Sequence, residues 1–176
     1  MTEPLPASLP TAANDAGPST MDEAERRALK RAFGAFPTGV TVVTTWRDGE
    51  PLGFTANSFT SVSIDPPLLL VCHAHGGLSG TAFAEAEGFA VNILAADQEP
   101  VAMRFASKVP DRFSVVPHEN GLNGPLITGS AAWLDCAMHK TVEAGDHTIL
   151  IGRVQRHATF DQAPLVYWNG RFHEGL

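Results

Sequence analysis

Cysteine and long apolar runs are scarce in this sequence. Among 176 residues there are two cysteines, Cys72 and Cys136, and neither belongs to a CxxC pair. A disulfide framework or a thiolate zinc site is therefore not expected, and the reduced thiols of a cytoplasmic protein are the simpler interpretation. No apolar run approaches the length that crosses a bilayer, and the N-terminus lacks the basic and apolar regions of a secretory signal. We predict a cytoplasmic protein with no membrane association.

Positive charge is scarce as well. The 12 Lys and Arg residues face 19 Asp and Glu residues, which leaves a formal net charge of -7. Because no basic patch or basic helix is visible, a nucleic-acid partner is not expected. Two catalytic signatures are also missing. Gly121, Gly124 and Gly129 do not have the GxGxxG spacing of a Rossmann site, and no GxSxG or Ser-His-Asp set supports hydrolysis.

The composition, with 44% hydrophobic and 18% charged residues, suits one globular domain with a core. Residues 1–19 are rich in proline and lack periodicity, so we expect a disordered or loosely ordered tail before a single domain at 20–176. A capping box at Thr20–Glu23 and apolar residues at helical spacing predict an amphipathic helix over 21–35. Its apolar positions are Leu29, Ala32, Phe33 and Phe36.

Most of the remaining chain is predicted to form β-strands. Runs of β-branched and apolar residues alternate with turn signals, of which Asp48-Gly49 and Asn169-Gly170 favour two-residue hairpins. Pro66 and Pro67 cannot donate ladder hydrogen bonds and belong at a strand's entry, and the run that follows them is expected to be buried on both sides. The expected strands are 40–46, 52–60, 68–73, 89–94, 126–141, 147–160, 165–168 and 171–173.

Two further helices and one long loop are expected between these strands. One short helix runs from Ser79 or Thr81 to about Glu87, another is capped by Asp97, and residues 107–125 form the loop. Strand neighbours are mostly antiparallel, and there is no βαβ alternation. The predicted fold class is therefore mainly β, a β-barrel with flanking helices.

A short polar stretch, Thr55-Ala56-Asn57-Ser58, stands among apolar strand residues. Alternation along a strand places Thr55, Asn57 and Phe59 on one face. Small side chains let a planar ring approach, while amide and hydroxyl groups can hydrogen-bond its polar edge. The segment therefore predicts a site for a flat cofactor, and the alternative is an ordinary edge strand with a solvated face.

Two groups of residues are candidates for binding an anion. Ser79 and Thr81 follow a Gly-Gly pair at an expected helix start, where hydroxyl and N–H groups either bind a phosphate or cap the helix. Lys108 and Arg112 lie in the long loop and could bring positive charge to the same ligand. Taken alone, such residues are more often solvated surface charges.

The histidines support two further hypotheses. His147 follows a Gly-Asp pair between two long strands, where its ring can stack on or hydrogen-bond to an aromatic ligand. His73 and His75 share one face of a strand and suggest a metal site completed by His139 or His147. No carboxylate or cysteine accompanies them at ligand spacing, so we predict no metal.

Taken together, these motifs resemble the short-chain flavin reductases, the reductase components of two-component flavin-dependent monooxygenases, which are built on the FMN-binding split barrel. The resemblance covers about residues 33–172. The matching motifs are Phe36-Pro37-Thr38-Gly39-Val40-Thr41-Val42-Val43-Thr44-Thr45, Gly53-Phe54-Thr55-Ala56-Asn57-Ser58-Phe59, Ser63-Ile64-Asp65-Pro66-Pro67-Leu68, Phe89-Ala90-Val91-Asn92-Ile93-Leu94, Arg112-Phe113, Gly145-Asp146-His147-Thr148-Ile149, Pro164-Leu165-Val166-Tyr167 and Gly170-Arg171-Phe172.

The resemblance implies an antiparallel Greek-key split barrel, a homodimer, and an NAD(P)H:flavin oxidoreductase that reduces FMN or FAD and supplies the reduced flavin to a partner monooxygenase. It also implies that His147, in a motif with Gly145 and Asp146, contacts the nicotinamide of NADH or NADPH. The residues implied to bind cofactor are Thr55, Ala56, Asn57 and Ser58 at the flavin ring and ribityl chain, Cys72 and His73 along the ring, Ser79 and Thr81 at the phosphate, Phe105 and Arg112 over the flavin, and Arg171 at the dinucleotide.

The implied chemistry is hydride transfer from nicotinamide C4 to flavin N5, for which the protein supplies stacking distance, orientation and a dry surface. No side-chain nucleophile is required, in agreement with the lack of a nucleophile motif in the sequence. Two alternatives stay open: a non-catalytic flavin- or haem-binding protein on the same barrel, and an oxidase of an amine such as pyridoxamine phosphate. The Gly-Asp-His motif argues against the first, and the lack of a basic cluster for a substrate phosphate argues against the second.

Overall fold

The computed structural model describes residues 21–77 and 81–174, so the predicted tail and Ser79 lie outside the described residues. Its largest element is a seven-stranded antiparallel sheet. The strands are β2 Thr41–Arg47, β3 Glu50–Ala56, β4 Thr60–Ser63, β5 Leu68–Ala74, β6 Gly88–Ile93, β9 Ala132–Ala144 and β10 His147–Thr159. They follow the order β3-β2-β6-β9-β10-β5-β4, so β3 and β4 are the two edges of the sheet. The mainly β, antiparallel fold that the sequence predicts is confirmed.

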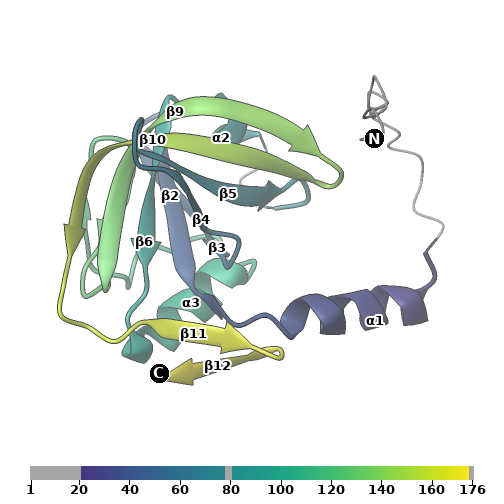
Figure 1. Ribbon diagram of the computed structural model, residues 1–176. Helices are drawn as coiled ribbons and strands as arrows, with labels where there is room; N and C mark the ends of the chain where they lie inside the picture. Colours follow the sequence, from purple (N-terminus) through teal and green to yellow (C-terminus); the bar gives the residue numbers. More distant parts are fainter. Residues whose placement is uncertain (1–20, 78–80, 175–176) are drawn as a thin grey trace, which may run out of the picture.

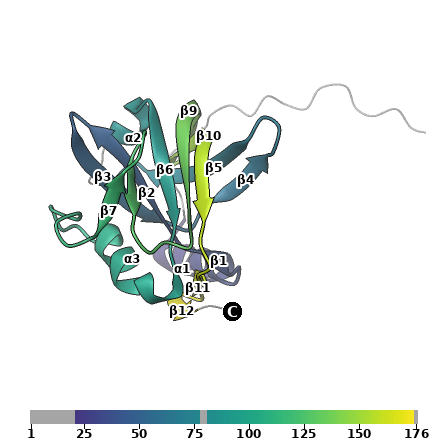
Figure 2. The same ribbon diagram turned by 90° about the vertical axis from the view of Figure 1, so that its left-hand side faces the viewer.

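Two smaller sheets and the helices complete the fold. They are β1 Thr38–Gly39, β7 His118–Asn120, β8 Pro125–Ile127, β11 Leu165–Trp168 and β12 Arg171–Glu174, with α1 Glu23–Gly34, α2 Ala82–Glu85, η1 Ala96–Gln98 and α3 Glu99–Ala106. Strands β1, β11 and β12 form one small sheet, and β7 and β8 form the other. Figures 1 and 2 show α3 and the β11–β12 hairpin below the main sheet. No described helix is long and apolar enough to cross a membrane.

Both faces of β2 are buried, which explains its uninterrupted β-branched run. Successive strand residues point to opposite faces. Val42 belongs to a core cluster with Phe105 and Leu165, whereas Val43 belongs to a second cluster with Leu150. The strand therefore separates the barrel interior from a layer that contains α3 and β11.

The two predicted hairpin turns are confirmed. Asp48 and Gly49 have φ of 53° and 81°, and Asn169 and Gly170 have φ of 49° and 77°. Two successive positive φ values are the requirement of a type I′ turn, which Asn, Asp and Gly meet at least cost. Strand β5 begins directly after Pro67, as the missing N–H groups of the proline pair require.

The first helix differs from the prediction in its cap and in its burial. Asp22, not Thr20, is the N-cap: its carboxylate accepts from the backbone N–H of Ala24 and Glu25, and the Glu25 carboxylate accepts from the Asp22 N–H. None of the helix residues is buried, and Phe33 is 70% exposed. Figure 1 shows α1 extending sideways from the rest of the chain.

Two predicted strands are wrong because each is interrupted. The expected strand 52–60 ends at Ala56, since the chain then passes from one edge of the sheet to the other and resumes as β4. The expected strand 126–141 is broken after β8, where Gly129 takes a φ of 82° and allows the turn into β9. The predicted loop 107–125 also contains a strand, β7, which pairs with β8.

Two finer expectations are also corrected. Strand β5 alternates between half-buried and buried residues, so it is not buried equally on both sides. Asp97 does not cap a helix: it lies inside η1, and the Gln98 side chain accepts from the Ala95 N–H instead. Gln98 makes this contact in place of Asp97 because its longer amide side chain can reach back to the Ala95 N–H group.

Candidate active site

The two edges of the main sheet are joined by residues 57–59, which belong to no strand. Asn57 is exposed there and lines two pockets that also share Tyr167 and Gly170. The smaller pocket, of about 340 Å³, is lined by Val40, Thr55, Asn57, Met103, Ala106, Tyr167, Gly170 and Phe172. The larger, of about 630 Å³, is lined by Lys30, Arg31, Phe33, Gly34, Phe36, Asn57, Tyr167, Asn169 and Gly170. Because they share lining residues, the two pockets adjoin each other beside the end of β3, and together they are called the cavity at Asn57.

The structure brings Thr55 and Asn57 to the same pocket, as strand alternation predicts. The Thr55 hydroxyl donates to the carbonyl oxygen of Ala102 in α3 at 2.6 Å, so its remaining capacity is to accept. Ala56 points the other way and is 8% exposed in the barrel core. The expected position of Phe59 is wrong: it packs against that same core, because the strand has already ended.

Ser58 and Cys72 are brought together across the opening between the sheet edges. The Cys72 N–H donates to the Ser58 hydroxyl at 2.9 Å. This bond fastens the segment that carries Asn57 to strand β5. Ser58 thus holds the wall of the cavity in place, and its contact with a flavin stays a prediction.

His73 follows Cys72 on the opposite face of β5 and is 4% exposed. Its ring packs against those of Phe54 and Phe83, with centroids 4.7 Å and 5.2 Å away. Burial lowers the pKa of His73, and the nearby rings of His147 and His75 lower it further. His73 is therefore an uncharged packing residue in this structure, and a direct contact with a flavin ring stays a prediction.

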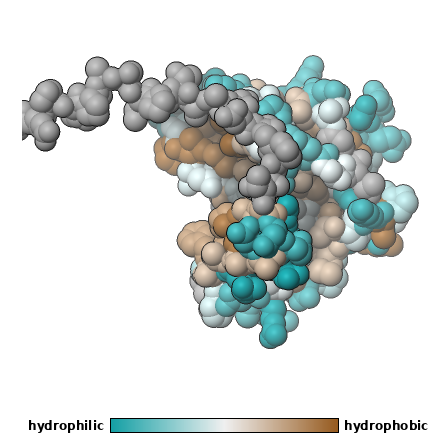
Figure 3. All heavy atoms as spheres, turned by 90° about the vertical axis from the view of Figure 1, so that its right-hand side faces the viewer, coloured by the Kyte–Doolittle hydropathy of each residue, from teal (hydrophilic) through white to brown (hydrophobic). Residues whose placement is uncertain are grey.

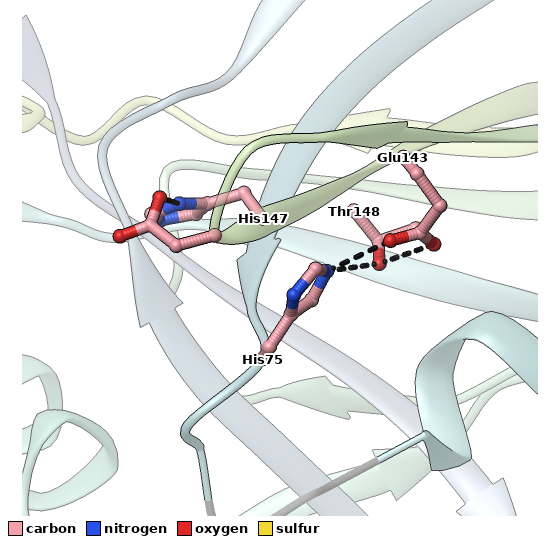
Figure 4. A network of polar contacts seen from close by, with 5 residues as sticks. His75, Glu143, His147 and Thr148 are labelled. Carbon is pink, nitrogen blue, oxygen red and sulfur yellow. Dashed lines mark hydrogen bonds and ion pairs between the residues drawn. The ribbon is translucent and has the colours of Figure 1, made fainter. Parts of the chain in front are cut away.

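The hairpin between β9 and β10 carries the predicted nicotinamide contact. Gly145 has a φ of 65°, and His147 opens β10 opposite Ala74 of β5. The Nδ1 atom of His147 lies 2.7 Å from a carboxylate oxygen of Asp146 (Figure 4). This hydrogen bond and the charge of His147 lower the pKa of Asp146, so the carboxylate is ionised and can only accept. Nδ1 is therefore the donor, which leaves Nε2 of His147 for a ligand.

Four other candidates, Thr81, Phe105, Arg112 and Arg171, are not among the residues that line the cavity. The Thr81 hydroxyl donates to the carboxylate of Glu85 at 2.7 Å, so it makes no capping bond to α2, and its contact with a phosphate stays a prediction. Phe105 is 1% exposed and packs edge-on against Phe113, which gives it a place in the core and not an open position over a cofactor. The remaining two are Arg112 and Arg171.

Arg112 holds the long loop against β3. Its guanidinium donates to the carbonyl oxygens of Gly53 and Ser107. Burial lowers its pKa, although an arginine stays protonated at any ordinary pH. Arg171 is exposed at the start of β12, opposite Trp168 in the hairpin ladder. Both contacts with cofactor stay predictions.

Two aromatic residues of the predicted β11–β12 hairpin line the cavity but were not assigned to the site from the sequence. Tyr167 and Phe172 face each other across the Asn169-Gly170 turn, with ring centroids 5.2 Å apart. Both line the smaller pocket. Their presence beside a type I′ turn was a usable signal, but only the tertiary fold places this hairpin next to Asn57.

Two basic residues of α1 were missed as well. Lys30 and Arg31 line the larger pocket, which makes them candidates for the phosphates of a nucleotide. In the described part of the chain, no three His, Cys, Asp or Glu side chains are grouped so that they could hold a metal ion.

Comparison with known proteins identifies the family. The sequence profile described as flavin reductase like domain matches residues 33–176. This chain belongs to the flavin reductase family. Its relatives include the reductase subunit of stachydrine N-demethylase from Rhizobium meliloti, 51% identical over 76% of this chain and 59% of the relative. The reductase component of flavin-dependent trigonelline monooxygenase from Acinetobacter baylyi is 49% identical over 88% of this chain and 51% of the relative.

Solved structures of flavin reductases agree with the fold. The NADH:FAD oxidoreductase of Streptomyces globisporus, solved in complex with NAD and FAD fragments, superposes with a TM-score of 0.81 at 42% identity and covers 88% of this chain and 95% of its own. The split-barrel architecture is thereby shown. This flavin reductase homologue nevertheless spans little more than half the length of the two relatives above, at 59% and 51%.

Proposed function

We propose that this protein is an NAD(P)H:flavin oxidoreductase that reduces FMN or FAD and supplies the reduced flavin to a partner monooxygenase. The observation that carries the proposal is the cavity at Asn57: Ser58, the next residue, is bonded to Cys72 of β5, and the end of that strand pairs with His147. Support comes from relatives named NADH-dependent FAD reductase and FMN reductase, at 46% and 41% identity. Because NAD(P)H is a reductant of the cytoplasm, we propose that compartment as its place of action.

The residues present fit a flavin and a nicotinamide. A bound pair of these cofactors supplies hydride transfer, and the chain supplies binding and orientation. The exposed amide of Asn57 offers both a donor and acceptors to the polar edge of a ring, while Thr55 can accept. Tyr167 and Phe172 form an aromatic wall of the smaller pocket against which a planar ring can pack.

His147 is the proposed contact for the nicotinamide. Asp146 holds its Nδ1–H, which fixes the ring and leaves Nε2 free to hydrogen-bond the amide of the dinucleotide. This arrangement moves no proton and needs no nucleophile, so it suits a role in orientation. A non-catalytic flavin- or haem-binding protein is the alternative, and no such contact is required there.

The proposed assembly is a homodimer. Helix α1 has 12 residues, buries none of them, and leaves Phe33 and Phe36 70% and 74% exposed. An isolated helix of that length is marginal in water, so a second surface is needed to stabilise it. Figure 3, which views the molecule from the side toward which α1 extends, shows hydrophobic surface in brown beside hydrophilic surface in teal. A second copy of the chain is the proposed cover.

The test is steady-state oxidation of NADH and NADPH in air with added FMN or FAD. Turnover that depends on free flavin is expected, and its absence would favour the simple binder. His147→Ala is expected to lower kcat/KM for NADH by about tenfold or more while flavin affinity changes less than about twofold. His157→Ala is the matched control, because His157 is an exposed histidine of the same strand. Equal losses of reduction and flavin binding would contradict the assigned role.

A further inference from the structure

His75, which has no role in the site described so far, joins three elements at the end of β5. Its backbone N–H donates to the carbonyl oxygen of Asp146 at 3.0 Å. Its Nε2 atom lies 3.0 Å from a carboxylate oxygen of Glu143 and 3.1 Å from the hydroxyl of Thr148. We call His75, Glu143 and Thr148 the His75 clasp. Figure 4 shows the ring of His75 directed toward the other two residues of the clasp.

The direction of these hydrogen bonds follows from proton counting. Thr148 donates its single hydroxyl proton to Glu143 at 3.0 Å, so toward His75 it can only accept. Glu143, as a carboxylate, also only accepts. Nε2 of His75 must therefore carry a proton and donate to both oxygens. The three side chains form a closed set in which each available proton has an acceptor.

The clasp acts on the turn that presents His147. Glu143 and Thr148 are opposite each other in the β9–β10 ladder, and Thr148 is opposite His73 in the β10–β5 ladder. Between Glu143 and Thr148 lie only the turn residues and His147. Thr148 is 4% exposed, so one member of the clasp is buried in the sheet. The side chains of His75 and Glu143 are 44% and 64% exposed at the hairpin.

We propose that His75 is a positioning residue for the dinucleotide: it ties the 144–147 turn to β5 and so fixes the place of His147. This rests on the proposed function and assigns a residue outside the Gly-Asp-His motif to substrate orientation. His75 does not line the cavity at Asn57, so its loss affects the nicotinamide side and leaves flavin binding alone.

The experiment measures KM for NADH, kcat and the flavin Kd for the full chain and three variants. For His75→Ala, KM for NADH is expected to rise about tenfold, which corresponds to the loss of one charge-assisted hydrogen bond discounted for exposure, while the flavin Kd stays within about twofold. His75→Gln keeps an N–H donor at nearly the same reach and is expected to restore most of the loss. His139→Ala, at an exposed histidine of β9, is the control and is expected to behave as wild type.

Each outcome decides the proposal. Equal KM values for wild type, His75→Ala and His139→Ala, or no rescue by His75→Gln, would overturn the positioning role. A parallel loss of flavin affinity and thermal stability in His75→Ala would show a purely structural residue and overturn it too. Wild-type protein that oxidises no NADH with either flavin would overturn the proposed function together with this inference, whereas active wild type with unchanged variants overturns the inference alone.

Discussion

At the scale of single residues, environment changes what a side chain can do. His73 belongs to a His-x-His pair that suggests metal binding in the sequence, yet its ring is buried against those of Phe54 and Phe83. His75, two residues further on, is 44% exposed and bonded to Glu143. Burial disfavours the charged form of His73, whereas His75, just beyond the end of β5, bonds to a carboxylate, so two histidines two residues apart have different chemistry.

The free energy of unfolding is expected to fall with decreasing pH because of His73. Its folded-state pKa is lowered, chiefly by burial, so between that pKa and the unfolded value near 6.5 the unfolded chain binds more protons. The contribution is fully present above about pH 6.5 and is lost as pH falls, by at most about 1.4 kcal/mol per pH unit. Urea unfolding from pH 7.5 to 5 is expected to show a shallower decline for His73→Leu than for wild type. An equal decline in His73→Leu and in the exposed-site control His157→Leu would contradict this.

At the scale of elements, one buried amide joins three strands. Asn92 of β6 is fully buried, and its Nδ2 donates to the carbonyl oxygens of Val42 and Pro125 at 3.1 and 3.2 Å. Its Oδ1 accepts from the Ile127 N–H at 2.8 Å. Strand β8 is short, and these bonds satisfy backbone groups that its ladder with β7 leaves open.

Removing this amide is expected to be costly. Asn92→Ala leaves the Ile127 N–H buried without that partner, while the Pro125 carbonyl keeps the Thr44 hydroxyl at 2.7 Å, and the expected loss in free energy of unfolding is about 2 kcal/mol. Asn120→Ala, at an exposed position of β7, is the control and should change stability by less than about 0.5 kcal/mol. Urea unfolding measures both. A loss for Asn92→Ala no larger than that of the control would show that the bonds of Asn92 do not stabilise the fold.

At the scale of the whole molecule, α1 stands out because none of its residues is buried. It is attached through the Gly34 carbonyl, which accepts from the Asn169 N–H, and the Ala35 carbonyl, which accepts from the Trp168 indole. Its side chains pack into no core. Its Phe33 also lines the larger pocket, so a second copy that covers α1 would lie close to the proposed site.

The proposed dimer is tested by sedimentation velocity at micromolar concentration. Wild type is expected to be dimeric, and Phe33→Glu is expected to shift it toward monomer by at least about tenfold in Kd, because a charge would be buried in an apolar contact. Ala24→Glu is the control, since nine residues at 3.6 per turn place it on the opposite side of the helix. A monomeric wild type, or equal behaviour of the two variants, would contradict a dimer formed through α1.

Local rules account for the elements that were predicted correctly. The turns at Asp48-Gly49 and Asn169-Gly170 need positive φ at both central residues, and few residue types accept it. The start of β5 after Pro67 follows from a missing N–H group. Each of these depends on two or three adjacent residues, so it can be predicted without knowledge of the fold.

The errors arose where a distant segment decided the outcome. The strand expected to continue through Phe59 stops at Ala56 because the pairing partner changes. Strand β3, at one edge of the sheet, pairs with β2, whereas β4, at the other edge, pairs with β5. Nothing in the local apolar pattern records that change. The phosphate contact of Thr81 stays a prediction, although its hydroxyl is bonded to Glu85, four residues away.

The sequence by itself determined most of the strands, the turns and the family, because pattern and turn chemistry are local properties and the motifs occur in a fixed order along the chain. Only the tertiary structure decided which residues share the site. Asn57 meets Tyr167 across the cavity, and His75 meets Glu143 across the hairpin, although each pair is far apart in sequence. The physical reason is that a side chain's partners and solvent exposure, which set its hydrogen bonds and its charge, are properties of the assembled barrel and not of neighbouring residues.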